Sequence, residues 1–197
     1  MVHPYHKYVF DEEARRFVGD FEEMYEAEQA ESFDSWFQGS MATLQRQISL
    51  AILSHYNFSS ILDLGCGKGH FSYLLKKENN RVIGIDSSPT AIRRAKAHYP
   101  DIDFLVLDVM ELDTLGDKCD LIIASEVLFY CAQWKQLLVT ISERGERLFI
   151  SLFLPDRPIG FIKSFDELRE ELTRSFEIET EMIQDGQQAY VLARANR

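Results

Sequence analysis

Apolar runs of strand length alternate with helical stretches from Ser60 to the end of the chain. Five of these runs predict strands, at residues 61–64, 81–85, 104–107, 121–124 and 147–154. The stretches between them carry helical apolar spacing or capping residues, at residues 70–77, 89–99, 134–145 and 164–176. Two final strands, 178–183 and 189–193, flank an Asp185-Gly186 turn and read as a hairpin.

Alternating strands and helices form parallel sheets covered by helices on both faces. We therefore expect an α/β fold: a doubly wound, seven-stranded, mostly parallel sheet with a C-terminal antiparallel hairpin strand. Ligands of such sheets bind outside the carboxyl ends of the strands, where the strand order reverses.

The first 57 residues have a different pattern, which predicts two added N-terminal helices. The first helix is expected within residues 11–34, because apolar residues recur there at three- and four-residue intervals (Ala14, Phe17, Val18, Phe21, Met24 and Tyr25). The second follows a predicted N-cap at Ser40 and has Leu44, Ile48 and Ile52 on one side. We expect both helices to cover the rest of the same domain.

Composition and charge narrow the functional classes. With 197 residues and 46% hydrophobic residues, the chain is suited to one folded domain. A formal net charge of -11 disfavours nucleic acids and anionic membranes, whose binding depends on basic residues. Ten acidic residues against two basic ones lie between Asp11 and Asp34, which is -8 of the total. Most of the negative charge is thus expected on one solvated helix face.

Cysteine and histidine usage predicts neither a disulfide framework nor a metal site. The three cysteines, Cys66, Cys119 and Cys131, are scattered and form no C-x-x-C pair. The histidines have no metal-ligand spacing with carboxylates or cysteines. The N-terminal residues also lack the apolar core of a signal peptide. We expect a reducing, cytoplasmic setting.

The chemical signal lies directly after the first strand of the sheet. Asp63-Leu64-Gly65-Cys66-Gly67-Lys68-Gly69 places three alternate glycines between a strand and a helix. Glycines let the chain turn sharply and let a ligand approach the backbone. A tight structural turn alone would need only one or two of them. Asp86 stands 21 residues after Gly65, just past the second strand, where a carboxylate can accept both hydrogen bonds of a ribose diol. The pair indicates an adenosine-containing cofactor.

This segment resembles the first motif of the class I S-adenosylmethionine-dependent methyltransferases. A dinucleotide fingerprint would need its last glycine where His70 stands, whereas the observed G-x-G-x-G, preceded by Asp63, matches the methyltransferase pattern. The resemblance runs from about Ser60 to the C-terminus, so we expect residues 58–197 to be the methyltransferase part and residues 1–57 its helical cover.

The resemblance implies S-adenosyl-L-methionine as cofactor and assigns residues to its parts. The methionine part would lie against Asp63, Gly65, Cys66 and Gly67, and the ribose against Asp86 and Ser87. Asp108 and Val109 would contact the adenine, while Glu126, between Ser125 and Val127, would face the sulfonium and the acceptor.

Several of these residues have structural alternatives. Asp108 could cap a helix, and Glu126 could contribute mainly through its backbone. Tyr130 could belong to the core rather than to a pocket wall. His70, beside the cofactor loop, could touch the ligand, but it is expected to cap its helix or to be exposed. Glu126 and Tyr130 are therefore the only candidates for a catalytic group, and no general base is assigned.

The N-terminal segment is expected to close over the cofactor, because little is inserted between the fifth strand and its helix. Its candidate residues are Tyr5, Tyr8, Phe33, Trp36, Phe37 and, for the methionine carboxylate, Arg46. The alternative is that these aromatic residues only pack the two helices onto the sheet. The Asp34-Ser35-Trp36 element also resembles nodulation-type N-methyltransferases.

The resulting expectation is a methyltransferase that moves the sulfonium methyl to an O or N atom of a small or medium-sized molecule. Two other functions stay open. One is a regulatory protein that binds S-adenosylmethionine or S-adenosylhomocysteine without catalysis, and the other is a nicotinamide-dependent oxidoreductase. The oligomeric state does not follow from the sequence.

Overall fold

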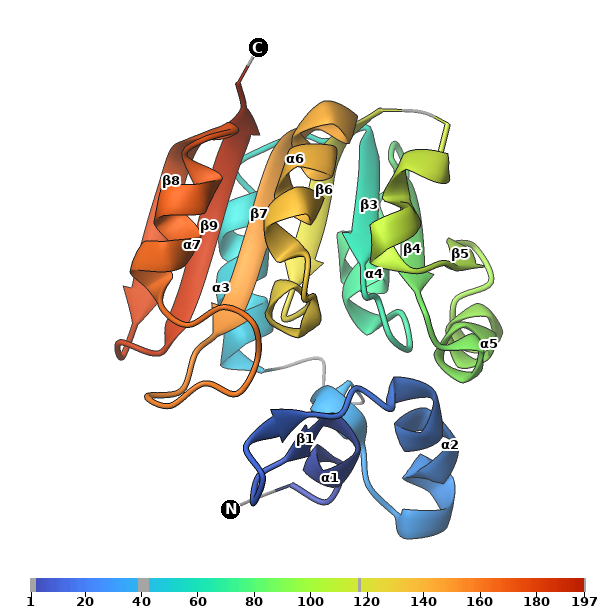
Figure 1. Cartoon of the computed structure of the whole chain (residues 1–197). Helices are drawn as coiled ribbons and strands as arrows, with labels where there is room; N and C mark the ends of the chain where they lie inside the picture. Colours follow the sequence, from blue (N-terminus) through green and yellow to red (C-terminus); the bar gives the residue numbers. More distant parts are fainter. Residues whose placement is uncertain (1–2, 39–42, 117, 197) are drawn as a thin grey trace.

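A seven-stranded sheet forms the centre of the computed structural model, which describes residues 3–38, 43–116 and 118–196 (Figure 1). The strand order is β5-β4-β3-β6-β7-β9-β8. The strands are β3 (Ser60–Leu64), β4 (Arg81–Asp86), β5 (Asp103–Val106), β6 (Cys119–Ser125), β7 (Gly145–Phe153), β8 (Phe176–Gln184) and β9 (Gln188–Ala195). Strands β3 to β7 pair in parallel, and β9 is antiparallel to both of its neighbours. The predicted sheet, with its antiparallel hairpin strand, is confirmed.

Helices cover both faces of the sheet, as expected for a doubly wound fold (Figure 1). One face carries α3 (Leu44–Leu53), α4 (His70–Leu75) and α5 (Pro89–His98), and the other carries α6 (Trp134–Arg144), α7 (Phe165–Leu172) and the 3-10 turn η2 (Val109–Thr114). Successive side chains of a strand point to opposite faces. In β6, Leu121 and Ile123 accordingly pack in one core cluster, and Ile122 and Ala124 in the other.

Two predicted helix starts are confirmed in detail. Ser88 caps α5 by accepting the Ala91 N–H, and Pro89 occupies the first helical position. Ser164 caps α7 through the Glu167 N–H. Helix α7 ends at Leu172, four residues earlier than predicted, because Phe176 already belongs to β8.

The predicted long helix within residues 11–34 is wrong in its first half. A short hairpin of β1 (Phe10–Asp11) and β2 (Arg16–Phe17) follows α1 (His6–Val9), and only Phe21–Glu31 is helical (α2). The Asp11 carboxylate accepts the Ala14 N–H, and Arg15 and Gly19 have φ of 49° and 80°. Left-handed residues and a side-chain-closed turn are incompatible with a continuous helix.

Within the predicted helical cover of residues 1–57, residues 3–38 lie below the carboxyl ends of the strands (Figure 1). From here on, the name cover is used for residues 3–38 alone. The cover also contains the 3-10 turn η1 (Ser35–Phe37) and packs on α5 through a cluster that includes Tyr5, Met24 and Ala91. By contrast, α3 lies on a face of the sheet. Its predicted cap, Ser40, is outside the described residues, and in the structure Thr43 caps α3 through the Arg46 N–H.

Candidate functional site

A cavity of about 1040 Å³ opens where the strand order reverses, between β3 and β6. Its floor is formed by residues at the carboxyl ends of β3, β4, β6 and β7, and its roof by the cover. The sequence-predicted site residues that line it are Arg46, Asp63, Gly65, Cys66, Asp86, Asp108, Val109, Glu126 and Tyr130. Among the residues predicted in the strand-end motifs, Gly67 and Ser87 do not contribute to the lining.

At its three glycine positions the loop has no space for a Cβ unless the neighbouring side chains shift. Gly65, Gly67 and Gly69 have φ of 62°, 55° and 81°, a conformation that other residues rarely adopt. A Cβ on Gly65 would lie 2.7 Å from a Val127 methyl carbon, and one on Gly67 would lie 2.2 Å from the Gln38 amide nitrogen. Cys66 between them is buried, and burial raises the pKa of its thiol well above the usual range. The thiol is therefore neutral and unsuited to act as a nucleophile.

Asp86 connects β4 to the glycine loop. One carboxylate oxygen accepts the Gly67 N–H and the other accepts the Ser88 N–H, both at 2.9 Å. Its position just past a predicted strand favours an exposed side chain, but Asp86 is only 8% exposed and still lines the cavity. Burial raises the pKa of Asp86 to about 6, against the lowering effect of the two N–H donors.

The other two strand-end aspartates also have structural roles. Asp63 accepts the Ser72 hydroxyl at 2.5 Å and so ties β3 to α4, and burial raises its pKa to about 7. Asp108 accepts the Met110 N–H at 2.8 Å and caps η2. Asp108 thus combines the predicted alternative, a cap, with a place in the cavity lining.

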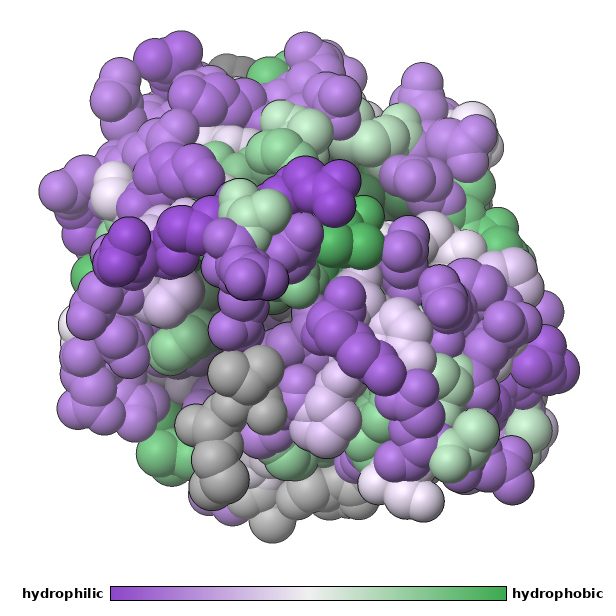
Figure 2. Space-filling model, turned by 60° about the horizontal axis from the view of Figure 1, so that its bottom comes forward, coloured by the Kyte–Doolittle hydropathy of each residue, from purple (hydrophilic) through white to green (hydrophobic). Residues whose placement is uncertain are grey.

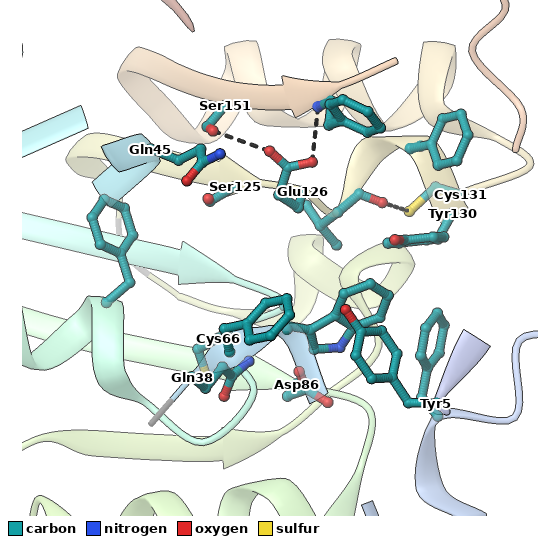
Figure 3. A pocket seen from close by; sticks show the side chains of 18 of the residues that line it. Tyr5, Gln38, Gln45, Cys66, Asp86, Ser125, Glu126, Tyr130, Cys131 and Ser151 are labelled. Atoms are coloured by element: carbon teal, nitrogen blue, oxygen red, sulfur yellow. Dashed lines mark hydrogen bonds between the residues drawn. The ribbon is translucent and has the colours of Figure 1, made fainter. Parts of the chain in front are cut away.

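Glu126 lies at the end of β6 with a left-handed backbone, φ 58° (Figure 3). Its carboxylate accepts the Ser151 hydroxyl at 3.1 Å, the Phe153 N–H at 2.9 Å and the Gln188 amide at 2.8 Å. Burial raises the pKa of Glu126 above its ordinary value, even though these three donors act to lower it. A non-glycine residue held in this conformation by several contacts is typical of functional sites.

Sequence reasoning missed Ser151 and Gln188. Ser151 is the one polar residue within the apolar run 148–154, which was the available signal. Gln188 reaches Glu126 only because β9 inserts next to β7, with Ser151 opposite Tyr190 in the pairing. That contact depends on the folded sheet and has no local sequence pattern.

Tyr130 belongs to the aromatic wall that the cover completes. It stacks on Phe17 at 5.9 Å between ring centroids, and Phe21 and Trp36 approach it at 5.4 and 5.5 Å. Burial raises the pKa of its hydroxyl well above 10, so the hydroxyl stays protonated at neutral pH. Tyr130 is therefore a wall of the cavity and a poor candidate for a base.

His70 neither caps α4 nor lies exposed, contrary to expectation. Gly69 is the cap residue, and the imidazole lines the cavity with its edge toward the Tyr99 ring. Its Nδ1 is buried and has no hydrogen-bond partner among the described residues. A buried polar atom without a partner marks a place for a ligand atom or water.

The acidic helix α2 does more than solvate a surface. The Glu28 carboxylate is buried, accepts Lys68 of the glycine loop at 2.9 Å and contacts Arg94 of α5. Lys68 also pairs with Asp34 at 2.6 Å. The expectation that this charge merely faces solvent is wrong for these residues, because burial requires charges to be paired.

Glu22 makes a further link, between α2 and the start of α5. Its carboxylate accepts the Thr90 N–H at 3.1 Å and the Thr90 hydroxyl at 2.6 Å, and it contacts the Ser88 hydroxyl. A carboxylate at the first turn of α5 is stabilised by the free N–H groups there. The cover is thus attached to the elements that carry Gly67 and Asp86.

The aromatic residues of the cover divide into two sets. Tyr5, Trp36 and Phe37 line the cavity. Tyr8 and Phe33 do not: Tyr8 donates to Glu31 at 2.9 Å, and Phe33 packs on Tyr5 and Tyr8.

Arg46 lies close to the last turn of the cover. It lines the cavity and donates to the carbonyl oxygens of Phe37 and Trp36, at 3.0 and 3.4 Å.

Within residues 3–38, 43–116 and 118–196, no group of three His, Cys, Asp or Glu side chains is placed to hold a metal ion. Over the same residues, every helix is too short or too polar to cross a bilayer.

Comparison with known proteins shows what this chain is similar to. The model of a methyltransferase domain matches residues 61–144. Malonyl-acyl-carrier-protein O-methyltransferase of Hamiltonella defensa is 30% identical over 100 residues, which are 49% of this chain and 39% of that protein. Nodulation protein S of Bradyrhizobium diazoefficiens is 27% identical over 113 residues, 56% of this chain and 51% of the relative. The chain thus spans about half or less of the length of these curated relatives.

A solved structure extends the likeness to the whole fold. N-methyltransferase NodS from Bradyrhizobium japonicum WM9, in complex with S-adenosyl-L-homocysteine, superposes with a TM-score of 0.72. The match covers 89% of this chain and 98% of that chain at 20% identity, which is a likeness of fold.

Proposed function

We propose that this protein transfers the sulfonium methyl group of S-adenosylmethionine to an O or N atom of a small or medium-sized molecule, because residues 61–144 match the model of a methyltransferase domain. The observation that carries the proposal is the link between Asp86 and Gly67. This link joins the carboxylate that we assign to the ribose to the glycine loop, and Asp86, Gly65 and Cys66 line the same cavity, where the strand order reverses.

The residues around the cavity fit this cofactor. Asp86 keeps free lone pairs for a ribose diol beyond its two N–H donors. Asp108 and Val109 would hold the adenine at the end of β5. The glycine loop, Arg46 and the unpartnered His70 Nδ1 surround the place for the methionine part. The cavity of about 1040 Å³ is large for one small molecule and has room for an acceptor as well.

The bound cofactor would supply an activated methyl group, so the protein needs chiefly to orient the acceptor in line with it. Glu126 is placed for this task, since Ser151, Phe153 and Gln188 fix its carboxylate at the cavity. An acceptor N–H or O–H can donate to it and be turned toward the methyl group. The raised pKa of Glu126 also brings it closer to that of a base working near neutral pH.

Glu126→Gln is expected to lower turnover by about 100-fold while leaving the dissociation constant of S-adenosylhomocysteine within about threefold. The glutamine amide cannot take a proton from the methyl acceptor. One of its N–H groups would also face one of the three donors that now bind the Glu126 carboxylate. The exposed Glu177 of β8 offers the matched control, Glu177→Gln. Equal turnover of the two variants would remove Glu126 from the reaction.

Cofactor affinity should depend on pH through Asp86. Its pKa of about 6 means that the carboxylate gains a proton as the pH falls through 6, and an acceptor for the ribose is lost. We expect the dissociation constant of S-adenosylhomocysteine to be flat above pH 7 and to rise by up to about tenfold per pH unit below 6. Calorimetry between pH 5 and 8 measures it.

Protonation of Asp86 would not unfold the protein, so unfolding through Asp86 does not explain the expected loss of cofactor affinity. A carboxyl whose folded pKa lies above its ordinary value of 3.8 destabilises the fold when ionised, so protonation between pH 6 and 4 adds stability. The melting temperature of the cofactor-free protein, measured over the same range, is the control. A flat affinity profile would contradict the ribose role of Asp86.

Turnover is tested by release of S-adenosylhomocysteine from the full chain with S-adenosylmethionine and pooled small metabolites. The proposal expects release that depends on the pool. Binding of S-adenosylhomocysteine without release in any pool would favour the regulatory alternative. The net charge of -11 supports a small-molecule acceptor rather than a nucleic-acid substrate. The three free cysteines support a reducing, cytoplasmic setting.

A further inference from the structure

Two exposed arginines that line the cavity are in contact with each other. Arg15 lies in the turn between β1 and β2, and Arg157 in the loop between β7 and α7. The Arg15 guanidinium donates to the Arg157 carbonyl oxygen at 2.9 Å, and both residues line the cavity that contains Glu126. Segments 142 residues apart in sequence thus bring two arginine residues of the cavity lining together.

Neither guanidinium has a carboxylate partner among the described residues. The nearby acidic groups are engaged elsewhere: Asp156 accepts the Gln187 amide at 3.1 Å, and Glu12 lies 3.7 Å from His6. Most other arginines of this acidic chain are paired, namely Arg16, Arg81, Arg94, Arg147, Arg169, Arg174 and Arg194. The cavity therefore has two cations available for an anion.

Aromatic side chains line the same cavity as these arginines and Glu126. Phe10 contacts Phe129 and Tyr130 at 6.0 and 5.9 Å between ring centroids. Phe153, whose N–H donates to Glu126, is 45% exposed and lines the same cavity. The face of the molecule that carries the cover is mostly hydrophilic, and hydrophobic residues show there chiefly in recesses between hydrophilic groups (Figure 2). The aromatic side chains inside the cavity suit a planar apolar ligand.

We propose that the methyl acceptor is an aromatic carboxylic acid. Its carboxylate binds Arg15 and Arg157, its ring lies against Phe10, Tyr130 and Phe153, and its nucleophilic atom points to Glu126. Guanidinium groups recognise carboxylates through parallel charge-assisted hydrogen bonds, which gives them an advantage over a neutral amide of the same shape. This inference rests on the proposed function, because it assigns the second ligand of the same cavity.

The test is calorimetric binding to the full chain saturated with S-adenosylhomocysteine. The probes are two acid–amide pairs: salicylate with salicylamide, and indole-3-acetate with indole-3-acetamide. We expect at least one acid to bind about tenfold more tightly than its amide. Arg157→Gln should remove this preference, and Arg15→Gln should reduce it. Arg16→Gln is the matched control, because Arg16 lies beside Arg15, carries the same charge and pairs with Asp11 outside this cavity.

The outcomes separate the two proposals. If the protein binds S-adenosylhomocysteine but binds acids and amides equally, or binds neither acid, the aromatic-acid assignment is wrong and the methyltransferase proposal stands. The assignment is also wrong if Arg16→Gln weakens acid binding as much as Arg157→Gln, since net charge alone would then be the cause. If S-adenosylhomocysteine itself does not bind, the proposed function fails.

Discussion

Asp86→Asn is expected to weaken binding of S-adenosylhomocysteine by about 100-fold, because two hydrogen bonds to a charged acceptor contribute about 1.5–3 kcal/mol each. Asparagine has nearly the same shape, but it has no charge and only one acceptor oxygen. One of the two backbone N–H groups that Asp86 now accepts, from Gly67 and Ser88, would also face an amide NH2. The ribose contact and the position of the glycine loop are therefore weakened together.

The fold should survive this substitution with a measurable cost. A buried N–H left without an acceptor costs about 1–3 kcal/mol, and a chain of this size loses about 2–4 °C in melting temperature per kcal/mol. Asp103→Asn is the control, because Asp103 is exposed on β5 and pairs with Arg81 away from the cavity. Unchanged affinity in a folded Asp86→Asn variant would exclude the ribose role.

Glu28→Gln is expected to detach the cover from the glycine loop. The Glu28 carboxylate is 6% exposed and pairs with both Lys68 and Arg94, so its loss leaves two partly buried cations undercompensated. Removing one partner of a buried ion pair typically costs about 3–5 kcal/mol. The remaining Lys68–Asp34 pair reduces this, and we expect a loss of about 2–4 kcal/mol in the free energy of unfolding or of cover opening.

Hydrogen exchange would show which part of the Glu28→Gln variant loses stability. In Glu28→Gln the amides of α2 should exchange faster, while those of the central strands keep their protection. Cofactor affinity should fall as well, because Lys68 and the Gln38 amide, which accepts the Lys68 N–H at 2.6 Å, lie at the glycine loop. Glu26→Gln is the matched control, since Glu26 is exposed on the same helix. Identical exchange in the two variants would contradict the proposed attachment of the cover.

The central sheet could be predicted from the sequence because each buried strand is a short apolar run with its own boundaries. Ser60, Gly65 and the Ser88-Pro89 pair set those boundaries through local chemistry. Once the strands were located, Asp86 and Asp108 could be predicted to lie near each other, because residues at the carboxyl ends of parallel strands converge. Local patterns thus predicted the floor of the cavity.

The cover could not be predicted in the same way. The spacing of Phe17, Phe21 and Met24 satisfied a helical period, but the Asp11 turn and the left-handed Arg15 and Gly19 end that regularity. The pairing of Glu28 with Lys68 joins residues 40 positions apart, and that of Gln188 with Glu126 joins residues 62 apart. Contacts of this kind follow from tertiary packing, so they appear only with the structure.

The central claim is that the cavity binds S-adenosylmethionine rather than a nicotinamide dinucleotide. Thermal unfolding of the full chain with S-adenosylhomocysteine or with NAD tests it most directly, because a ligand that binds only the folded state raises the melting temperature. We expect a clear rise with S-adenosylhomocysteine, lost in Asp86→Asn and retained in Asp103→Asn, and no rise with NAD. Stabilisation by NAD alone would contradict the claim.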